Sequence, residues 1–416
     1  MLAAVASPSP AASPAPSASP TTAALPVSSQ LVIAAGFSAS IVATVSGARE
    51  IAALPNGDLL VATSGATIAI VPSAESTGIA GTPATFATIP DIDAAGITYA
   101  PNGSIYVGST NGVWQLGYTT GAQTASSVTE IAHVRTGSLS PDPDDQHTTT
   151  SVAATPTTLY ASVGSDCNAC AEVDPTRATI QAMGLNGAGM QTLATRVRNA
   201  IALTIDPTNG HLWAGGADQD DQPFGHPYEW MDDVASHATV VDYGWPVCYE
   251  DHTIAPIPAG LPATSCNGVT IPAFVLPAYS TIIGATFYPP NETGAYAFPA
   301  AYAGGLFLAA HGSWHNNPDG TSAAQPLVAY VPFAAGIAPA TPVNWANPAT
   351  QWQPFLSGFG TNISNRIGRP TGITVGSQGS LFIADDQTGN IYRMRPAAAG
   401  SQAKHRPVRG SGRAGG

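Results

Sequence analysis

Lysine, and charge of either sign, are scarce in this sequence. Charged residues make up 9% of the 416 residues, against roughly 25% in an ordinary soluble domain. The only lysine is Lys404, in a basic tail, so residues 1–403 contain nine arginines and no lysine. The net charge of −13 argues against nucleic acid as a partner, because phosphate binding requires a basic surface. With so few cations, the position of each arginine becomes informative.

Long apolar runs are absent as well. No stretch approaches the roughly 18–20 apolar residues that span a bilayer, so the protein is not expected to be membrane-embedded. Glycine (43 residues) and proline (37 residues) are abundant instead. Glycine costs backbone entropy in a helix and proline removes a helix hydrogen bond, which argues against long helices and favours short strands joined by turns. The low lysine content and the Ser-, Thr-, Ala- and Gln-rich composition favour a secreted or periplasmic protein.

The two ends of the chain differ from its middle. Residues 1–29 are dominated by Ala, Pro, Ser and Thr, with too little large apolar surface to offset the entropy of ordering, which predicts a disordered linker. They lack the charged and apolar regions of a complete signal peptide, which predicts a trimmed or mis-started export precursor. We expect residues 397–416 to form a disordered basic tail and residues 30–396 to form the folded body.

One pattern recurs along the body. A turn of Pro, Asn, Gly or Asp is followed by a short apolar strand and then by Gly, Ser or Asp. The pattern occurs at residues 54–65, 99–112, 155–166, 206–220, 301–314 and 376–394. Its equivalent apolar positions are Leu59, Ile105, Leu159, Leu212, Leu306 and Leu381, which lie 46, 54, 53, 94 and 75 residues apart.

This repeat predicts an all-β, six-bladed β-propeller. Propeller blades recur with a period of roughly 40–50 residues, and the two longer gaps are expected to hold inserted loops. An apolar segment at residues 31–45 precedes the first repeat. We expect it to close the ring by pairing with the last blade, which would protect edge strands. A β-sandwich or a β-helix with similar strands is the alternative.

Five motifs within this frame occur together and in a specific order. They are GSDCNACAEVDPTRATI (164–180), ATRVRNAIALTIDPTNGHLWA (194–214), YGWPVCYEDH (243–252), AAHGSW (309–314) and GRPTGITVGSQGSLFIADD (368–386). Together they resemble the glucose/sorbosone dehydrogenase family over about residues 30–396. Members of that family are secreted six-bladed propellers, and its characterised members oxidise sugars with pyrroloquinoline quinone (PQQ) and Ca²⁺. The resemblance therefore implies PQQ- and Ca²⁺-dependent oxidation of an aldose or related sugar, with electrons passed to an external acceptor.

The resemblance assigns the general base to His147, in the run PDPDDQHTTTSV. A neutral histidine at this point takes the hydroxyl proton while hydride leaves C1 of the sugar. Imidazole suits this role because its unperturbed pKa of about 6.5 lies near working pH. Relatives often carry an arginine three residues later, where this chain has Thr150. The alternative is a solvated loop histidine beside Asp144 and Asp145.

Three arginines stand at the entrances of apolar strands. Arg198 and the following Asn199 match a family pair that contacts the quinone, and Arg369 and Arg49 occupy similar positions in the last and first repeats. PQQ carries three carboxylates, which arginine binds through parallel hydrogen bonds. A ring of such arginines would form an anion-binding pocket on an acidic protein. The alternative for Arg198 is a surface arginine balancing nearby acids, and Arg393 is expected to be peripheral.

A further cofactor contact is implied at His311, in HGSW. The family's fifth blade meets the cofactor here, at a place where some relatives use lysine, and this body has none. Trp314, three residues later, is equally compatible with core packing.

The calcium site is implied at Asp218 and Gln219. Relatives bind Ca²⁺ here largely through backbone carbonyls, and Asp220, Asp221 and Glu229 offer further hard oxygen ligands. Relatives usually have glycine or an apolar residue where Asp218 stands. The alternative is an acidic, solvated loop.

The four cysteines do not form a haem or zinc site. Cys167 and Cys170 form C-x-x-C, but the next residue is alanine, and no further zinc ligands lie near. Disulfides are the default in an exported chain. We therefore expect Cys248 to pair with Cys266, and Cys167 with Cys170.

Two classes of function follow. The first is a PQQ- and Ca²⁺-dependent sugar dehydrogenase. The second is a non-catalytic carbohydrate-binding propeller or a lactonase-like hydrolase, which would need acidic or amide metal ligands from several blades. The arginines at the strand entrances favour the anionic cofactor.

Overall fold

A computed structural model describes residues 23–135, 147–220, 225–256, 261, 265–334 and 338–398. The expected linker up to residue 22 and the expected tail from residue 399 onward lie outside these residues, as do Asp144, Asp145 and Asp221. The remainder of the expected linker contains a short strand, β1 (Leu25–Pro26), which pairs with β3 (Phe37–Thr44).

Six sheets, each built on four antiparallel strands, form the body. The first contains β4 (Ala48–Ala53), β5 (Leu59–Thr63), β6 (Thr67–Val71) and β7 (Ala84–Thr88). The second contains β8 (Gly96–Tyr99), β9 (Ile105–Gly108), β10 (Gly112–Leu116) and β11 (Val128–His133). The third contains β12 (Thr150–Ala154), β13 (Thr158–Val163), β14 (Thr179–Gly184) and β15 (Gln191–Thr195), with β19 (Val241–Asp242) added in parallel.

The second half of the ring repeats this plan. The fourth sheet contains β16 (Asn199–Ile205), β17 (Leu212–Ala217), β18 (Glu229–Asp233) and β20 (Phe274–Leu276). The fifth contains β21 (Ile282–Phe287), β22 (Leu306–Ala310), β23 (Leu327–Val331) and β26 (Gln353–Ser357), joined at its edge by β2 (Val32–Ile33). The sixth contains β27 (Pro370–Val375), β28 (Leu381–Asp385), β29 (Asn390–Pro396) and β3.

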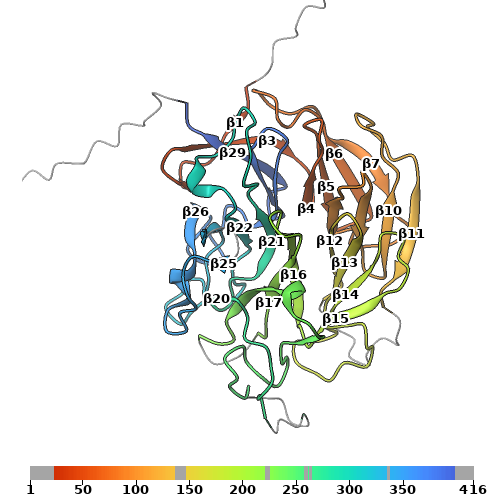
Figure 1. Ribbon diagram of the computed structural model, residues 1–416. Coiled ribbons are helices and arrows are strands. Elements are labelled where there is room, and N and C mark those ends of the chain that lie inside the picture. Colours follow the sequence, from red (N-terminus) through yellow and green to blue (C-terminus); the bar gives the residue numbers. More distant parts are fainter. Residues whose placement is uncertain are drawn as a thin grey trace, which may run out of the picture.

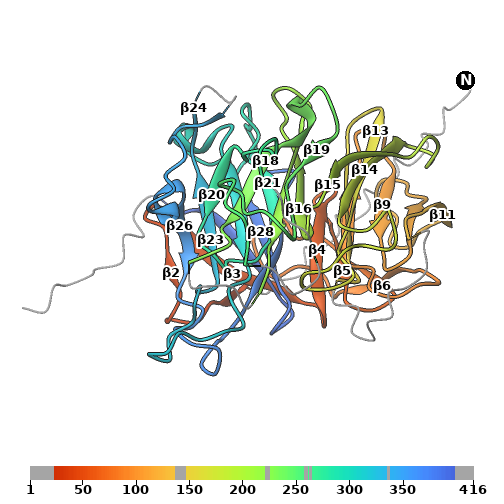
Figure 2. The same ribbon diagram turned by 90° about the horizontal axis from the view of Figure 1, so that it is seen from below.

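The first strands of the six sheets form a closed inner ring. Strands β4, β8, β12, β16, β21 and β27 pack against one another in this order, and β27 packs against β4. In Figure 1 the sheets follow one another around the molecule in chain order, from orange through green to blue. Figure 2 shows the same sheets from a second direction. The molecule is therefore a six-bladed β-propeller, as expected, and neither a sandwich nor a β-helix.

The repeat read from the sequence corresponds to the second strand of each blade. All six of its equivalent apolar positions lie there, and each side chain is at most 1% exposed. Their burial supplies the cores that lie between neighbouring blades, because each sheet must cover its apolar faces with the next. The expected ring closure is also confirmed, because β3 pairs antiparallel with β29.

The two long gaps hold insertions, as expected. One runs between β18 and β20 and carries β19 and the 3₁₀ helix Val234–Ser236. The other lies between β23 and β26 and carries the hairpin β24 (Phe333–Ala334) and β25 (Ala338–Pro339) and the 3₁₀ helix Pro348–Gln351. Together with Ala300–Tyr302, these are the helices within the described residues. None of them has the length and apolar character to cross a bilayer.

Glycine allows the inner strands to approach one another closely. A Cβ on Gly284 of β21 would lie 2.2 Å from the Thr371 carbonyl oxygen of β27. A Cβ on Gly372 would lie 2.5 Å from the Arg49 carbonyl oxygen of β4. Any larger residue would push these strands apart. The glycines therefore hold the ring tight directly beneath the face that carries Arg49 and Arg369.

Both expected disulfides form. Cys248 pairs with Cys266 in the fourth-blade insertion, and Cys167 pairs with Cys170 in the loop after β13. No described cysteine is free.

Replacing Cys248 and Cys266 with serine is expected to lower the free energy of unfolding by about 3 kcal/mol, because the bridge closes a loop of moderate length. Urea denaturation of oxidised wild type and of the double variant measures the difference. The Cys167→Ser/Cys170→Ser variant is the control and is expected to lose less, because its loop separates the cysteines by only 3 residues. Equal midpoints and slopes for wild type and the Cys248/Cys266 variant would contradict the expectation.

Candidate functional site

A cavity of about 470 Å³ opens at the end of the ring where several first strands begin. Arg198, Thr281 and Arg369 directly precede β16, β21 and β27, and His147 lies three residues before β12. The lining residues are His147, Arg198, Asn199, Ile201, Ala217, Asp218, Asp220, Glu229, Tyr279, Thr281, His311, Trp314 and Arg369. The cavity therefore gathers residues from at least four blades onto one face of the propeller.

Six of the eight residues singled out from the sequence line this cavity. They are His147, Arg198, Asn199, Asp218, His311 and Arg369. Arg49 does not line it, but its Nη1 contacts Asp386 Oδ2 at 2.8 Å, and Asp386 in turn contacts His311. Gln219 is buried beside the cavity, and its side-chain amide donates to the Pro246 carbonyl at 3.4 Å.

The contacts of His147 define which ring nitrogen carries the proton. Its Nδ1 faces the Ser165 carbonyl at 3.0 Å and the Ser165 hydroxyl at 2.9 Å. That hydroxyl donates its own proton to the Cys167 carbonyl at 2.7 Å. Both groups facing Nδ1 therefore act as acceptors, so Nδ1 is the protonated nitrogen and Nε2 is the basic one.

Two arginines hold the backbone of His147 in place. Arg135 Nη2 donates to the His147 carbonyl at 2.8 Å, and Arg177 Nη2 donates to it at 3.3 Å and to the Ser165 carbonyl at 2.7 Å. Thr150 lies fully buried at the start of β12, and its hydroxyl has no hydrogen-bond partner among the described residues. The positive charge next to His147 is therefore supplied by Arg135 and Arg177.

Arg198 is buried and already engaged by the protein. Its Nη2 contacts Asp220 Oδ2 at 2.9 Å and the Asn168 side-chain oxygen at 3.1 Å, and its Nε donates to the Asn168 carbonyl at 3.2 Å. Asn168 lies between the two cysteines of the C-x-x-C disulfide. The cross-linked loop therefore fixes the direction of the guanidinium.

Arg369, unlike Arg198, forms no direct salt bridge with a carboxylate among the described residues. Its Nε donates to the His311 carbonyl at 3.1 Å and its Nη2 to the Gly312 carbonyl at 2.7 Å. It forms no salt bridge with any described residue. Burial, followed by the charge of Arg366, lowers the pKa of Arg369 to about 10, so it remains cationic at neutral pH.

His311 and Asp386 form a buried pair behind this arginine. His311 Nε2 lies 3.0 Å from both carboxylate oxygens of Asp386. Burial lowers the pKa of His311 to about 4. Burial alone would raise the pKa of Asp386, but the hydrogen bond from His311 and the charges of Arg49 and Arg369 together lower it to about 2. At neutral pH His311 is therefore a neutral donor to an ionised Asp386, which leaves its Nδ1 as an acceptor.

Carboxyl groups form another part of the cavity wall. Burial, followed by the Glu250 carboxylate, raises the pKa of Asp218 to about 7. Burial, followed by Asp218, raises the pKa of Glu229 well above its usual value. One oxygen of Glu229 and one of Glu250 are buried without a hydrogen-bond partner among the described residues. A bound cation would offset the repulsion between these carboxyl groups and would coordinate their unpaired oxygens.

These carboxyl groups do not by themselves complete a metal cage. Within the described residues, no three His, Cys, Asp or Glu side chains converge so that they could hold a metal ion. A cation at Asp218 and Glu229 would also need backbone carbonyls or water as ligands, which suits Ca²⁺ with its six to eight oxygen ligands.

Several contacts of this site were not singled out from the sequence. Ser165, Asn168 and Asp386 orient His147, Arg198 and His311 through the contacts described above. Trp314 is 65% exposed at the cavity mouth, so the core-packing alternative for it is wrong. The sequence ADDQ (384–387), at the end of β28, was a signal for Asp386, because polar residues at the end of a propeller strand lie on a loop-bearing face.

A family model described as TrAA12-like matches residues 31–397. Of solved structures, the chain is similar to the holo PQQ domain of pyranose dehydrogenase from Coprinopsis cinerea, at 21% identity and a TM-score of 0.69, over 88% of this chain and 97% of that one. It is also similar to the calcium structure of carbohydrate-active enzyme family AA12 from Trichoderma reesei, at 19% identity and a TM-score of 0.71, over 88% and 97% of the two chains.

Two further matches are more distant or partial. The apo form of a soluble aldose sugar dehydrogenase from Escherichia coli matches at 14% identity and a TM-score of 0.58, over 87% of this chain and all of that one. An uncharacterised protein from Borreliella burgdorferi is 25% identical over 245 residues, which is 57% of this chain. The match spans 56% of that relative's length.

A six-bladed propeller with a cavity of arginines, histidines and carboxyl groups at one end defines the class of this molecule. The chain belongs to the TrAA12-like family, and it shares its fold with the PQQ domain of pyranose dehydrogenase and with the soluble aldose sugar dehydrogenase. The family resemblance read from the sequence is thereby confirmed.

Proposed function

We propose that this protein is a quinoprotein dehydrogenase that oxidises an aldose or related sugar with PQQ and Ca²⁺ and passes the electrons to an external acceptor. The observation that carries the proposal is the cavity itself. It combines Arg369, a partly buried cation whose guanidinium donates only to backbone carbonyls among the described residues, with a histidine whose Nε2 is the basic nitrogen. PQQ is the cofactor named for the related pyranose dehydrogenase domain.

The residues of the cavity fit the cofactor in charge and in size. When bound, PQQ supplies the acceptor for the hydride that leaves C1 of the sugar. Arg369 and Arg198 would bind its carboxylates, and Asn199 would offer a donor and an acceptor beside them. His147 Nε2 would take the proton of the C1 hydroxyl, while Ser165 keeps the imidazole in the required tautomer. Burial and the charges of Arg369 and Arg49 would keep His311 neutral beside the cofactor, although Asp386 opposes this, and Asp386 would fix the direction of the His311 Nε2–H bond.

Calcium would occupy the carboxyl wall. Asp218 and Glu229 line the cavity, and the unpaired oxygen of Glu229 is available as a ligand. The ion would offset the repulsion between these carboxyl groups and stabilise negative charge that develops during oxidation. Gln219 would contribute through its backbone carbonyl, because its side chain is bonded to Pro246.

The two disulfides favour a secreted or periplasmic location, where such bonds persist. There the protein would meet free sugars and an external electron acceptor.

Adding PQQ and Ca²⁺ to the purified protein is expected to yield a stoichiometric complex with altered cofactor absorbance, and turnover of at least one aldose with a dye acceptor. The double variant Asp218→Asn/Glu229→Gln is expected to need at least tenfold more Ca²⁺ for half-maximal reconstitution, because two carboxylate ligands are lost. Asp319→Asn, at an exposed turn, is the control.

Two outcomes would redirect this assignment. If PQQ does not bind but sugars do, the carbohydrate-binding propeller replaces the dehydrogenase, and the exposed Trp314 becomes its natural stacking surface. If lactones are hydrolysed in a metal-dependent manner without PQQ, the lactonase-like alternative holds.

A further inference from the structure

A second cavity of about 470 Å³ lies along the axis of the propeller. Its walls come from the first strands of all six blades, and it extends to the turns that follow them, at Pro101, Pro156 and Pro207. It therefore faces the end of the ring opposite the candidate active site. Ile201 lines both cavities, so only a thin layer of side chains separates them.

The charges along this second cavity are all acidic. Its titratable lining residues are Glu50, Asp206 and Tyr99, and no lysine, arginine or histidine of the described part of the chain lines it. Glu50 Oε1 and Asp206 Oδ2 are each buried without a hydrogen-bond partner among the described residues. The nearest cation to Glu50, Arg49, is turned toward Asp386 at the other face. Neither buried carboxyl group has a countercharge inside the cavity.

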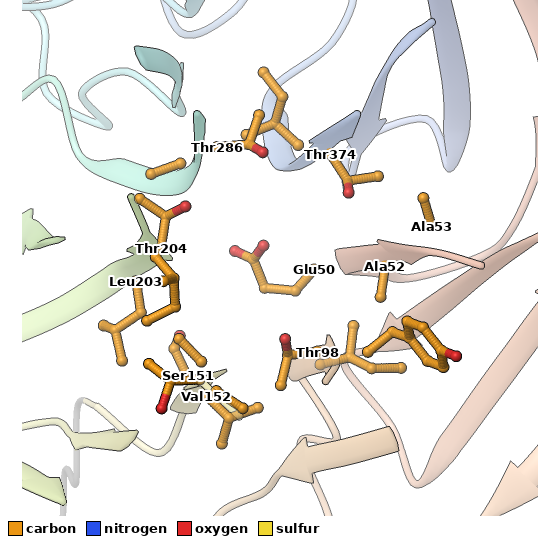
Figure 3. A pocket seen from close by; sticks show the side chains of 18 of the residues that line it. Glu50, Ala52, Ala53, Thr98, Ser151, Val152, Leu203, Thr204, Thr286 and Thr374 are labelled. Carbon is orange, nitrogen blue, oxygen red and sulfur yellow. The ribbon is translucent and has the colours of Figure 1, made fainter. Parts of the chain in front are cut away.

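Hydroxyl groups surround Glu50. Figure 3 shows its carboxyl group reaching into the middle of the ring, with Thr98, Thr204, Thr286 and Thr374 placed around it. Ser151 lines the same cavity. Serine and threonine hydroxyls are neutral oxygen donors that bind either a hard cation or the water of its hydration shell.

We propose that this axial cavity is a binding site for a hydrated divalent cation, anchored by Glu50 and surrounded by the threonine hydroxyls. The site is separate from the calcium site expected at Asp218 and does not depend on the proposed enzymatic activity. An anion is excluded by the two carboxyl groups. A single carboxylate with several waters is a coordination that small divalent cations accept, and the cavity has room for both ion and waters.

Titration of Glu50 supplies a second signature. Burial raises the pKa of Glu50 to about 8, although the nearby Arg49 charge opposes this shift. The other titratable groups facing the cavity, Asp206 and Tyr99, do not supply positive charge. Below pH 8 the cation must therefore displace a proton, so its affinity is expected to rise about tenfold between pH 6.5 and 7.5.

Mn²⁺ is the probe, because it accepts the same oxygen ligands as Mg²⁺ and Ca²⁺ and its free form is counted by electron paramagnetic resonance. The full chain is titrated without PQQ, in the background Asp218→Asn/Glu229→Gln, which removes the carboxylates of the other expected site. This background is expected to retain one Mn²⁺ per chain with a Kd of about 10⁻⁴–10⁻³ M. Adding Glu50→Gln is expected to weaken binding at least tenfold and to abolish its pH dependence.

Two variants make the result specific. Glu130→Gln removes a carboxyl group from an exposed position of β11 and is expected to leave Mn²⁺ binding unchanged. Thr286→Val/Thr374→Val keeps the charge but removes two hydroxyls, and is expected to weaken binding severalfold. Unchanged far-UV circular dichroism identifies the variants that are folded.

The proposal is overturned if the background variant binds no Mn²⁺ at concentrations up to about ten times the expected Kd. It is also overturned if Glu50→Gln and Glu130→Gln bind Mn²⁺ alike. Failure of PQQ to bind does not bear on these results, because no cofactor is present in the titration.

Discussion

Replacing His147 with alanine is expected to lower the turnover of aldose by about 10²–10⁴-fold, the usual contribution of a positioned general base. The cofactor should still bind, because its anionic groups are expected to be held by the arginines. The physical reason is the tautomer. Ser165 keeps the proton on Nδ1, so Nε2 is the nitrogen that can accept the C1 hydroxyl proton. Steady-state rates with a dye acceptor, together with cofactor titration by absorbance, separate the two effects.

The control for this variant is His133→Ala. His133 lies on β11, where its Nδ1 contacts the exposed Glu130 at 3.1 Å, and its loss should leave both rate and binding unchanged. Replacing Ser165 with alanine tests the tautomer argument, because it removes one acceptor facing Nδ1 but keeps the carbonyl. A smaller loss is therefore expected. Full activity in His147→Ala would mean that the base lies elsewhere on the face, with His311 Nδ1 as the next acceptor to test.

Replacing Arg369 with alanine is expected to weaken PQQ binding by about 10²–10³-fold. Removing one partner of a buried, hydrogen-bonded charge pair typically costs several kcal/mol, and Arg369 forms no direct salt bridge with any described residue. Turnover at saturating cofactor should change much less than affinity. Cofactor titration at several concentrations, followed by rate measurements at saturation, distinguishes binding from chemistry.

Arg198→Ala provides a second measure of the same pocket. It is also expected to weaken reconstitution, partly because it leaves the Asp220 carboxylate unpaired near an anionic cofactor. The double variant Arg198→Ala/Asp220→Ala should therefore regain part of the loss. Arg196→Ala is the matched control, because Arg196 pairs with Asp242 on a partly exposed surface. If Arg369→Ala and Arg196→Ala bind PQQ equally, the arginine pocket is not the cofactor site.

Much of the candidate site was predictable because its cations stand at fixed points of a repeat. Arg198 and Arg369 precede first strands, and in a propeller all first strands begin at the same face. Their position on one face could therefore be predicted from the repeat alone, without any side-chain contact being known. The sequence could not exclude Gln219 from the lining or show that Arg49 acts through Asp386, because both depend on which way a side chain turns.

The partners of the site residues were not predictable in the same way. His311 and Asp386 are 75 residues apart, and Arg49 and Asp386 are 337 residues apart. No local pattern of turns or apolar positions marks such pairs. The first pair joins the fifth and sixth blades, and the second joins the sixth blade to the first, where the ring closes.

The sequence by itself determined the number of blades, the order of the strands, the closing strand and both disulfides. These features depend on local turn chemistry, on the burial of one apolar strand per repeat and on cysteines with few alternatives. Only the tertiary structure decided which nitrogen of His147 is basic, that Arg369 forms no direct salt bridge within the described residues, and that Glu50 faces the axis. The physical reason is that protonation and net local charge depend on groups gathered from several blades, and the closed ring alone places those groups within a few ångströms of one another.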